Sequence, residues 1–318
     1  RRAAAGRLMG APKGRSQRQL PVWMQRQERG NTFWLSIMTW LSLQLGRACS
    51  RVVLYGIALY FAVFARDAGG ASQAYLTRCL GRPAGWLDRY RHVLAFASTV
   101  HDRIYLLNDQ FERFDISHVG AEQLHAEYDA GQGILMFGAH LGSFEVLRAL
   151  ARKNPRLSMS MAMYPENARQ INQALAAINP RAVPDIIALG TLDAMLAVHR
   201  KLDEGALVGI LADRASGPDQ YLTLPFLGAP ARFPTGPFRM AVMLKRPVYF
   251  MAGIYLGGNR YQVHFERLEQ APPGTPRDAA IASLLGQYAA VLERHCRAHP
   301  YNWFNFFDFW KQDSPDHA

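Results

Sequence analysis

His140 and Glu145 are the two residues whose types and placement most directly indicate chemistry. They follow an apolar, β-type run at 134–137, and a short glycine-bearing turn leads into an expected helix from about Gly142. In a regular helix, a spacing of five residues would turn the two side chains roughly 140° apart. If His140 lies just before the helix and Glu145 in its first turns, the carboxylate can reach the imidazole. That pair would be a general base and its orienter, with the helix N-terminus lowering the histidine pKa.

The position of this pair matters more than its spacing, because one histidine near one glutamate is common. Polar groups just beyond the carboxyl end of a strand in an α/β sheet lie where ligands usually bind. The setting after a strand therefore favours a catalytic interpretation over a structural one.

A second group of polar residues follows the apolar run at 206–212. Asp213 and Arg214 come first, a Gly/Pro-rich loop containing Gly217 follows, and Thr235 begins another expected helix. A charged pair at a strand end, with such a loop and a helix start, suits an anion or a polar headgroup. The alternative is a salt-bridged surface loop. We expect these four residues to bind substrate.

Alternating strand and helix patterns predict the frame that holds these residues. Strands are expected at 133–138, 157–163, 206–212, 248–255 and 261–267. Helices are expected at 72–80, 86–108, 120–130, 143–152, 167–178, 191–203, 235–246 and 278–298. The fold class is therefore α/β, with a central, mostly parallel sheet flanked by helices and an antiparallel hairpin within 248–267.

The first 66 residues differ from the rest in charge and hydropathy. Residues 1–29 are rich in arginine, contribute much of the net charge of +11 and are expected to form a disordered tail. Residues 30–66 are expected to form an apolar, membrane-associated helical segment, and residues 67–318 the α/β domain. Because the tail carries most of the excess charge, the domain itself is only mildly basic, and no nucleic-acid partner is expected.

Three arrangements fit the apolar segment, in which Arg47 and Arg51 separate two runs. One is a tilted spanning helix with snorkelling arginines. Another is a helical pair in the membrane interface, with Trp34, Trp40 and Tyr60 at headgroup level. The third is a buried hairpin of a soluble protein. The basic flank favours membrane association and a cytoplasmic N-terminus.

Other familiar signatures are missing from the sequence: GxSxG, GxxxxGK, HExxH and a GxGxxG that opens a helix. The three scattered cysteines indicate neither a disulfide framework nor a zinc site, and no metal site is expected. His101 and Asp102 are expected at the surface, and His264 is expected to be structural. The aromatic stretch 301–310 is expected to pack or to form a membrane-interface edge.

Together these pieces resemble the lysophospholipid acyltransferase superfamily, which carries an HX4D/E motif. The branch they resemble most is the lipid A late acyltransferases of the lauroyl/myristoyl type, from about Trp23 to about Trp310. The resemblance rests on His140-Leu-Gly-Ser-Phe-Glu145 after a strand, Asp213 before Gly217-Pro218, Pro225-Phe226-Leu227-Gly228, Thr235-Gly236 and Pro247-Val248. It implies a glycerolphosphate-acyltransferase-like fold.

The resemblance also implies roles. His140 deprotonates an acceptor hydroxyl, Glu145 orients the imidazole, and the hydroxyl attacks a thioester carbonyl without an acyl-enzyme. Asp213 matches an acidic residue of the third motif. Tyr164 is also expected to bind substrate, although many lipid A enzymes have an arginine at this position. Arg214 and Arg169 are the candidates to supply the contact of that arginine.

The function expected from this resemblance is transfer of a fatty acyl chain to a hydroxyl of a glycolipid or lipid acceptor. The donor is an acyl carrier protein or CoA thioester, and no other cofactor is expected. The expected place is the cytoplasmic face of the bacterial inner membrane. Two alternatives are a noncatalytic lipid-binding homologue and an acyltransferase of another specialised lipid, such as an aryl-polyene or ornithine lipid. Seven apolar residues are candidates to line an acyl slot: Phe137, Phe144, Met159, Met161, Met163, Phe226 and Phe233.

Overall fold

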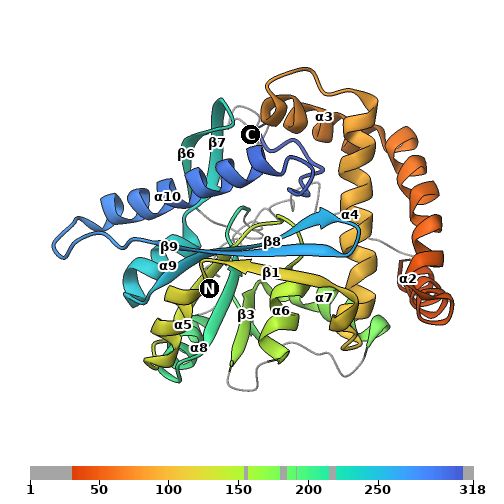
Figure 1. The fold of residues 1–318 in the computed structure, drawn as a ribbon. Helices are drawn as coiled ribbons and strands as arrows, with labels where there is room; N and C mark the ends of the chain where they lie inside the picture. Colours follow the sequence, from red (N-terminus) through yellow and green to blue (C-terminus); the bar gives the residue numbers. More distant parts are fainter. Residues whose placement is uncertain (1–30, 154–156, 180–184, 191, 215–219, 311–318) are drawn as a thin grey trace, which may run out of the picture. The chain divides into compact units, whose positions relative to one another are not determined.

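The structure is a computed structural model that describes residues 31–153, 157–179, 185–190, 192–214 and 220–310. The expected disordered tail at 1–29 and the loop residue Gly217 lie outside the described residues. The fold class expected from the sequence is confirmed, because helices flank a mostly parallel central sheet (Figure 1).

Seven strands form the central sheet of the described chain, in the order β1-β9-β8-β2-β5-β3-β4. Their bounds are β1 (Asp115–Val119), β2 (Ile134–Gly138), β3 (Met159–Met163), β4 (Ile186–Ala188), β5 (Leu207–Leu211), β8 (Val248–Gly257) and β9 (Arg260–Leu268). Strands β8, β2, β5, β3 and β4 run parallel to one another, whereas β9 is antiparallel to β8 and parallel to β1. The expected hairpin at 248–267 is therefore present. A separate antiparallel pair is formed by β6 (Tyr221–Phe226) and β7 (Ala229–Pro234).

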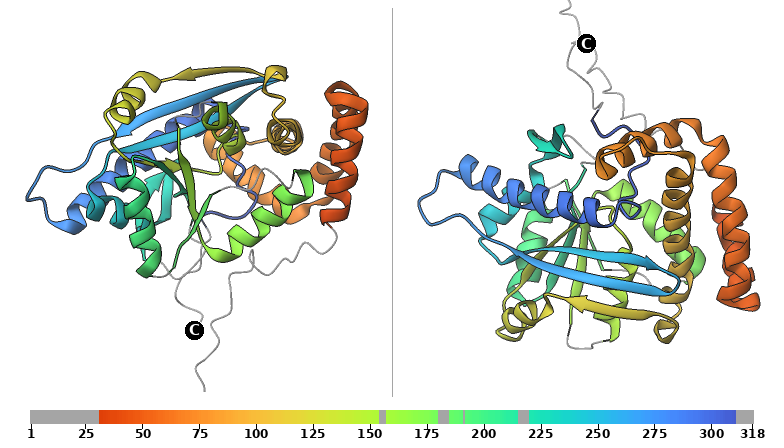
Figure 2. Two further views of the ribbon diagram at one scale, coloured as in Figure 1. Left: turned by 90° about the horizontal axis from the view of Figure 1, so that it is seen from below. Right: turned by 45° about the horizontal axis from the view of Figure 1, so that its top comes forward.

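Helices cover both faces of the sheet (Figures 1 and 2). Their bounds are α2 (Asn31–Phe64), α3 (Arg66–Leu80), α4 (Trp86–Leu107), η1 (Phe111–Arg113), α5 (Ala121–Asp129), α6 (Phe144–Lys153), α7 (Pro165–Ile178), α8 (Leu192–Asp203), α9 (Gly236–Leu244) and α10 (Arg277–Ala298). One core cluster joins the sheet to α3, α8, α9 and α10, and the other joins it to α4, α5, α6 and α7. The apolar runs that predicted β2 and β5 are buried on both faces, as strands inside a parallel sheet require.

Helix α2 packs beside α4, and this contact corrects one expectation (Figure 2). His101 and Asp102 were expected at the surface, but both are buried. Arg47 donates two hydrogen bonds to the Asp102 carboxylate (2.8 and 2.9 Å), and the Tyr261 hydroxyl donates a third (2.7 Å). Burial raises the pKa of Asp102, but the bonds from His101, Arg47 and Tyr261 and the charge of Arg47 outweigh it, so that the pKa is lowered. The pair is therefore an anchor for α2.

The outer side of α2 leaves large apolar side chains exposed. The helix bends at Gly46, whose φ of 76° and ψ of 167° are accessible to glycine. Beyond the bend, Arg51 donates to the Gly258 carbonyl and to the Tyr255 hydroxyl of the β8–β9 turn. The exposed large apolar residues among those of α2 whose side chains the structure describes are Trp40, Leu43, Leu45, Val52, Val53, Tyr55, Leu59, Tyr60, Phe61, Val63 and Phe64.

Candidate active site

His140 lies in a tight turn between β2 and α6, and backbone bonds hold this turn on two sides. The Ser143 amide donates to the Gly253 carbonyl of β8 (2.7 Å), and the Phe304 amide donates to the His140 carbonyl (2.7 Å). Gly142, with φ of 69°, approaches Gly253 so closely that a Cβ at position 142 would lie 2.0 Å from the Gly253 oxygen. The turn therefore requires glycine, and His140 has little freedom to shift.

Asp213 is the carboxylate that orients His140. The His140 Nδ1 lies 2.9 Å from Asp213 Oδ1, and the His140 amide donates to Oδ2 at 3.1 Å. A neutral imidazole that donates from Nδ1 to a carboxylate has its lone pair on Nε2. The His140 side chain is 37% exposed while Asp213 is fully buried, so this nitrogen can accept a proton from a substrate. The arrangement is that of a general base with a buried orienter.

The surroundings of Asp213 keep it ionised. Burial alone would raise the pKa of this carboxyl, but the nearby charges of His140 and Arg214, together with hydrogen bonds from His140, hold the pKa well below its usual range. Trp303 Nε1 also donates to Asp213 Oδ2, at 3.1 Å. A carboxylate anchored from several directions can fix both the tautomer and the orientation of the ring.

Glu145 does not reach His140, which corrects the expected pairing. It lies in the first turn of α6, and its buried side chain pairs instead with Arg148 (2.9 Å) and Arg103 of α4 (3.7 Å). Because His140 lies in the turn before α6, the direction of Glu145 is set by the first turn of the helix alone, which points it toward Arg103 of α4. In this geometry Glu145 ties α6 to α4, and the carboxylate beside the imidazole is that of Asp213.

Arg214 places a poorly solvated cation beside the pair. Its Nη2 lies 3.6 Å from Asp213 Oδ2, and its guanidinium carbon lies 4.7 Å from the centre of the Phe307 ring. The side chain is only 16% exposed, and Nε and Nη2 have no hydrogen-bond partner within the described part of the chain. Burial lowers the pKa of Arg214, although Asp213 opposes this effect. Two such N–H groups are suited to bind an anionic oxygen.

The remaining expected site residues have different surroundings. Thr235 is buried, and both its amide (2.8 Å) and its hydroxyl (3.1 Å) bond to the Gln220 carbonyl, which closes the loop that carries β6 and β7. Tyr164 caps the start of α7 beside Gly190. Arg169 is exposed on α7. Thr235 thus closes this loop, and substrate binding by Thr235 and by Tyr164 stays a prediction.

The aromatic C-terminal stretch contributes to the site, which spacing could not reveal. Trp303 is fully buried, and the backbone of residues 302–304 runs against the His140 turn through an antiparallel bridge to Leu141. Behind it, His92 bonds Ser72 Oγ through Nδ1 (2.7 Å) and the Trp303 carbonyl through Nε2 (2.9 Å). The expectation of packing is correct for Trp303 and Phe309, but it missed the contact with Asp213. The aromatic composition of the stretch was the only available signal.

An apolar cavity of about 180 Å³ lies among α5, α6 and the sheet. Met136, Leu147, Met159, Met251 and Phe265 are among its lining residues. The residues expected to line an acyl slot do not share one face. Phe137, Phe226 and Phe233 belong to the core cluster on the α10 side, whereas Phe144 and Met159 pack on the cavity side.

These features define a class of protein. A histidine base with a buried carboxylate follows two neighbouring strands of a mostly parallel sheet, where α/β enzymes bind substrates. Within the described residues, the hydrogen-bond partner of the imidazole is Asp213.

The sequence comparison places the chain within that class. Residues 23–312 match the family model of the bacterial lipid A biosynthesis acyltransferases, and the chain belongs to this family. It is therefore an acyltransferase. A search of curated proteins finds none that matches the chain.

Proposed function

We propose that this protein transfers a fatty acyl chain from a carrier-protein or CoA thioester to a hydroxyl of a lipid A-like glycolipid. The reaction would take place at the cytoplasmic face of the inner membrane. The observation that carries the proposal is the 2.9 Å bond between His140 Nδ1 and the buried Asp213. This bond leaves Nε2 as the basic nitrogen at the partly exposed end of the ring.

The proposed chemistry needs one base and no covalent enzyme intermediate. His140 Nε2 removes the proton of the acceptor hydroxyl while its oxygen attacks the thioester carbonyl. A C–O bond forms, and the carbonyl oxygen becomes an oxyanion. When this intermediate collapses, the C–S bond breaks and the thiolate receives the proton from the imidazolium. Asp213 stabilises the positive imidazolium in between.

Arg214 is the candidate to stabilise negative charge during the reaction. Its Nη2 lies 3.6 Å from Asp213 Oδ2, neither Nε nor Nη2 makes a hydrogen bond within the described residues, and a preorganised cationic donor can stabilise an oxyanion. The Arg214 guanidinium could also bind a phosphate of the acceptor. It would then supply the contact of the arginine whose position Tyr164 occupies in this chain.

Membrane attachment is proposed through the exposed side of α2. One described helix is long and apolar enough to cross a membrane, at Ser42–Phe64. Arg47 bonds to Asp102 of α4, and Arg51 bonds to the β8–β9 hairpin. Both guanidinium groups are therefore held against the α/β domain. A helix that lies in the membrane interface with its exposed apolar side toward lipid fits these contacts better than a free spanning helix.

A vesicle flotation experiment tests this attachment. Flotation with phosphatidylethanolamine/phosphatidylglycerol vesicles should recover the wild type, whereas a Val52→Glu/Phe64→Glu variant should stay in the dense fraction. Leu196→Glu, on α8, is the matched control because Leu196 is 64% exposed, like Val52 at 68% and Phe64 at 66%. Equal flotation of all three proteins would contradict the α2 assignment.

Lipid mass spectrometry tests the reaction itself. A deletion strain should contain a lipid that is lighter by one acyl chain, and the wild-type gene should restore its mass. His140→Ala should not restore it, although the protein accumulates normally. Full complementation by His140→Ala would contradict the base assignment and favour a noncatalytic lipid-binding protein.

A further inference from the structure

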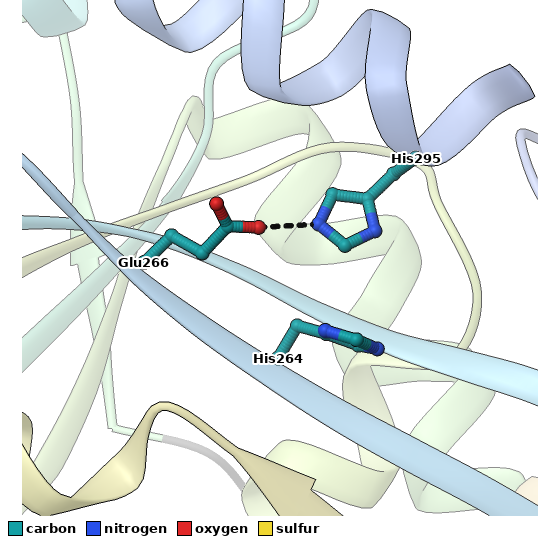
Figure 3. A group of neighbouring side chains, drawn as sticks. All are labelled: His264, Glu266 and His295. Atoms are coloured by element: carbon teal, nitrogen blue, oxygen red, sulfur yellow. Dashed lines mark hydrogen bonds and ion pairs between the residues drawn. The ribbon is translucent and has the colours of Figure 1, made fainter. Parts of the chain in front are cut away.

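Three titratable side chains gather between β9 and α10, outside the site described above. His264 and Glu266 are two residues apart on β9, so their side chains leave the same face of the strand. His295 of α10 faces them, as Figure 3 shows. One nitrogen or oxygen atom from each of the three residues lies within 4.8 Å of the others. His295 is buried, and the other two are half-buried.

We propose that His264, Glu266 and His295 bind a divalent transition metal, with zinc as the best fit. Two imidazoles and one carboxylate are a ligand set that zinc uses in proteins, with a fourth position for water or another side chain. Magnesium and calcium prefer sets made of oxygen only. This proposal concerns a second site and does not depend on the proposed function.

A third histidine lies near the same place. His299 directly follows the end of α10, and the centre of its ring lies 6.5 Å from that of His264. It is the nearest candidate for the fourth position, which water can also fill. The sequence did not predict a metal site because the two halves are about thirty residues apart and neither contains cysteine.

The present contacts are compatible with an ion at this position. The His264 Nε2 bonds Gln262 Oε1 (3.0 Å), which is the kind of outer hydrogen bond that orients a metal-bound imidazole. Glu266 is shared by His295 Nε2 (2.6 Å) and Arg294. The Arg294 side chain is 58% exposed and can turn into solvent, leaving the carboxylate to the metal.

An ion at this position would support the active site from outside. It would tie β9 to the last turn of α10, and the chain continues directly into Asn302 and Trp303. The Asn302 amide bonds the His299 carbonyl (3.0 Å), and Trp303 bonds Asp213. The metal would therefore stabilise the segment that positions Asp213, without taking part in acyl transfer.

Zinc binding to the full-length protein in detergent tests the proposal. After dialysis against a chelator, the protein is titrated with Zn²⁺ by competition with a chromophoric chelator, and its metal content is measured by mass spectrometry. We expect one zinc per chain and a higher unfolding temperature when zinc is added. His264→Ala should weaken binding at least about a hundredfold, because loss of a supporting residue alone costs 10–100-fold. His199→Ala is the control, since His199 is 52% exposed and pairs with Asp203 on α8.

Two further measurements keep the test decisive. If His264→Ala does not fold, Glu266→Gln preserves the side-chain shape and should also weaken binding. Co²⁺ substitution should give a tetrahedral spectrum without a thiolate charge-transfer band, because the three ligands contain no sulfur. The proposal is wrong if the chelator-treated wild type binds no added zinc, if the variants bind as tightly as wild type, or if the cobalt spectrum shows thiolate ligation.

Discussion

The Trp303 indole donates a hydrogen bond to Asp213 across a sequence separation of 90 residues. Asp213 in turn holds His140, 73 residues before it. Three distant segments of the chain thus meet at one buried carboxylate. The orientation of the base therefore depends on the C-terminal aromatic stretch as well as on the strands that precede the site.

Trp303→Phe should impair both stability and turnover. The substitution keeps an aromatic ring in the core but leaves one lone pair of a buried carboxylate unpaired. A hydrogen bond to a charged group is worth roughly 1.5–3 kcal/mol, so we expect a loss of about 2 kcal/mol in the free energy of unfolding. Urea denaturation measures this loss, and steady-state kinetics should show a lower kcat with little change in KM.

Trp310→Phe is the matched control for this change. Trp310 Nε1 donates at 3.3 Å to the Phe226 carbonyl and does not contact Asp213. It should lose less stability and keep its kcat. If both variants lose kcat equally, the indole bond to Asp213 has no special role in orienting His140.

The variants Asp213→Asn and Glu145→Gln distinguish the roles of the two acidic residues. An amide at position 213 can donate to Nδ1 and favour the wrong tautomer, so kcat should fall about a thousandfold or more, as for other orienting aspartates. Glu145→Gln should mainly lower stability, because it weakens the pairing with Arg148 and Arg103. Acyl-transfer assays, corrected for the folded fraction, should show a larger loss of kcat for Asp213→Asn than for Glu145→Gln. A larger loss of kcat in Glu145→Gln would favour the hypothesis that Glu145, and not Asp213, orients His140.

The buried strands of the fold could be predicted from the sequence, whereas its edges could not. β2 and β5 are continuous apolar runs, and their positions could therefore be predicted from the sequence. β1 was missed because four of its five residues are exposed, and β4 because it has three residues. His140 and Asp213 were identified by their position after strands. Their contact was not, because β2 and β5 are neighbours only through the sheet order, which the local pattern does not specify.

Arg214→Gln should reduce the chemical step. Its Nη2 lies 3.6 Å from Asp213, the carboxylate that bonds His140, and removal of one oxyanion donor typically costs about 10²–10³ in kcat. Arg169→Gln is the control, because Arg169 is exposed on α7 and was the other candidate to replace the missing arginine. Measured kcat and KM should change strongly only for Arg214→Gln. If KM alone rises, Arg214 binds the acceptor in its ground state instead of stabilising the oxyanion.

His92 should make folding stability depend on pH below neutrality. Burial lowers the pKa of His92 from 6.5 to about 4, although the bond to the Trp303 carbonyl opposes this shift. The unfolded chain then binds a proton at a higher pH than the folded protein does. The stabilisation is therefore complete above pH 6.5 and is lost as the pH falls toward 4, by about 3 kcal/mol in total.

Urea denaturation at intervals from pH 7.5 to 5 measures the slope of the free energy of unfolding against pH. In chelator-treated protein, burial also lowers the pKa of His264, which then adds to the slope. His92→Gln should therefore flatten the slope without abolishing it, and an unchanged slope would mean that His92 is not the titrating group.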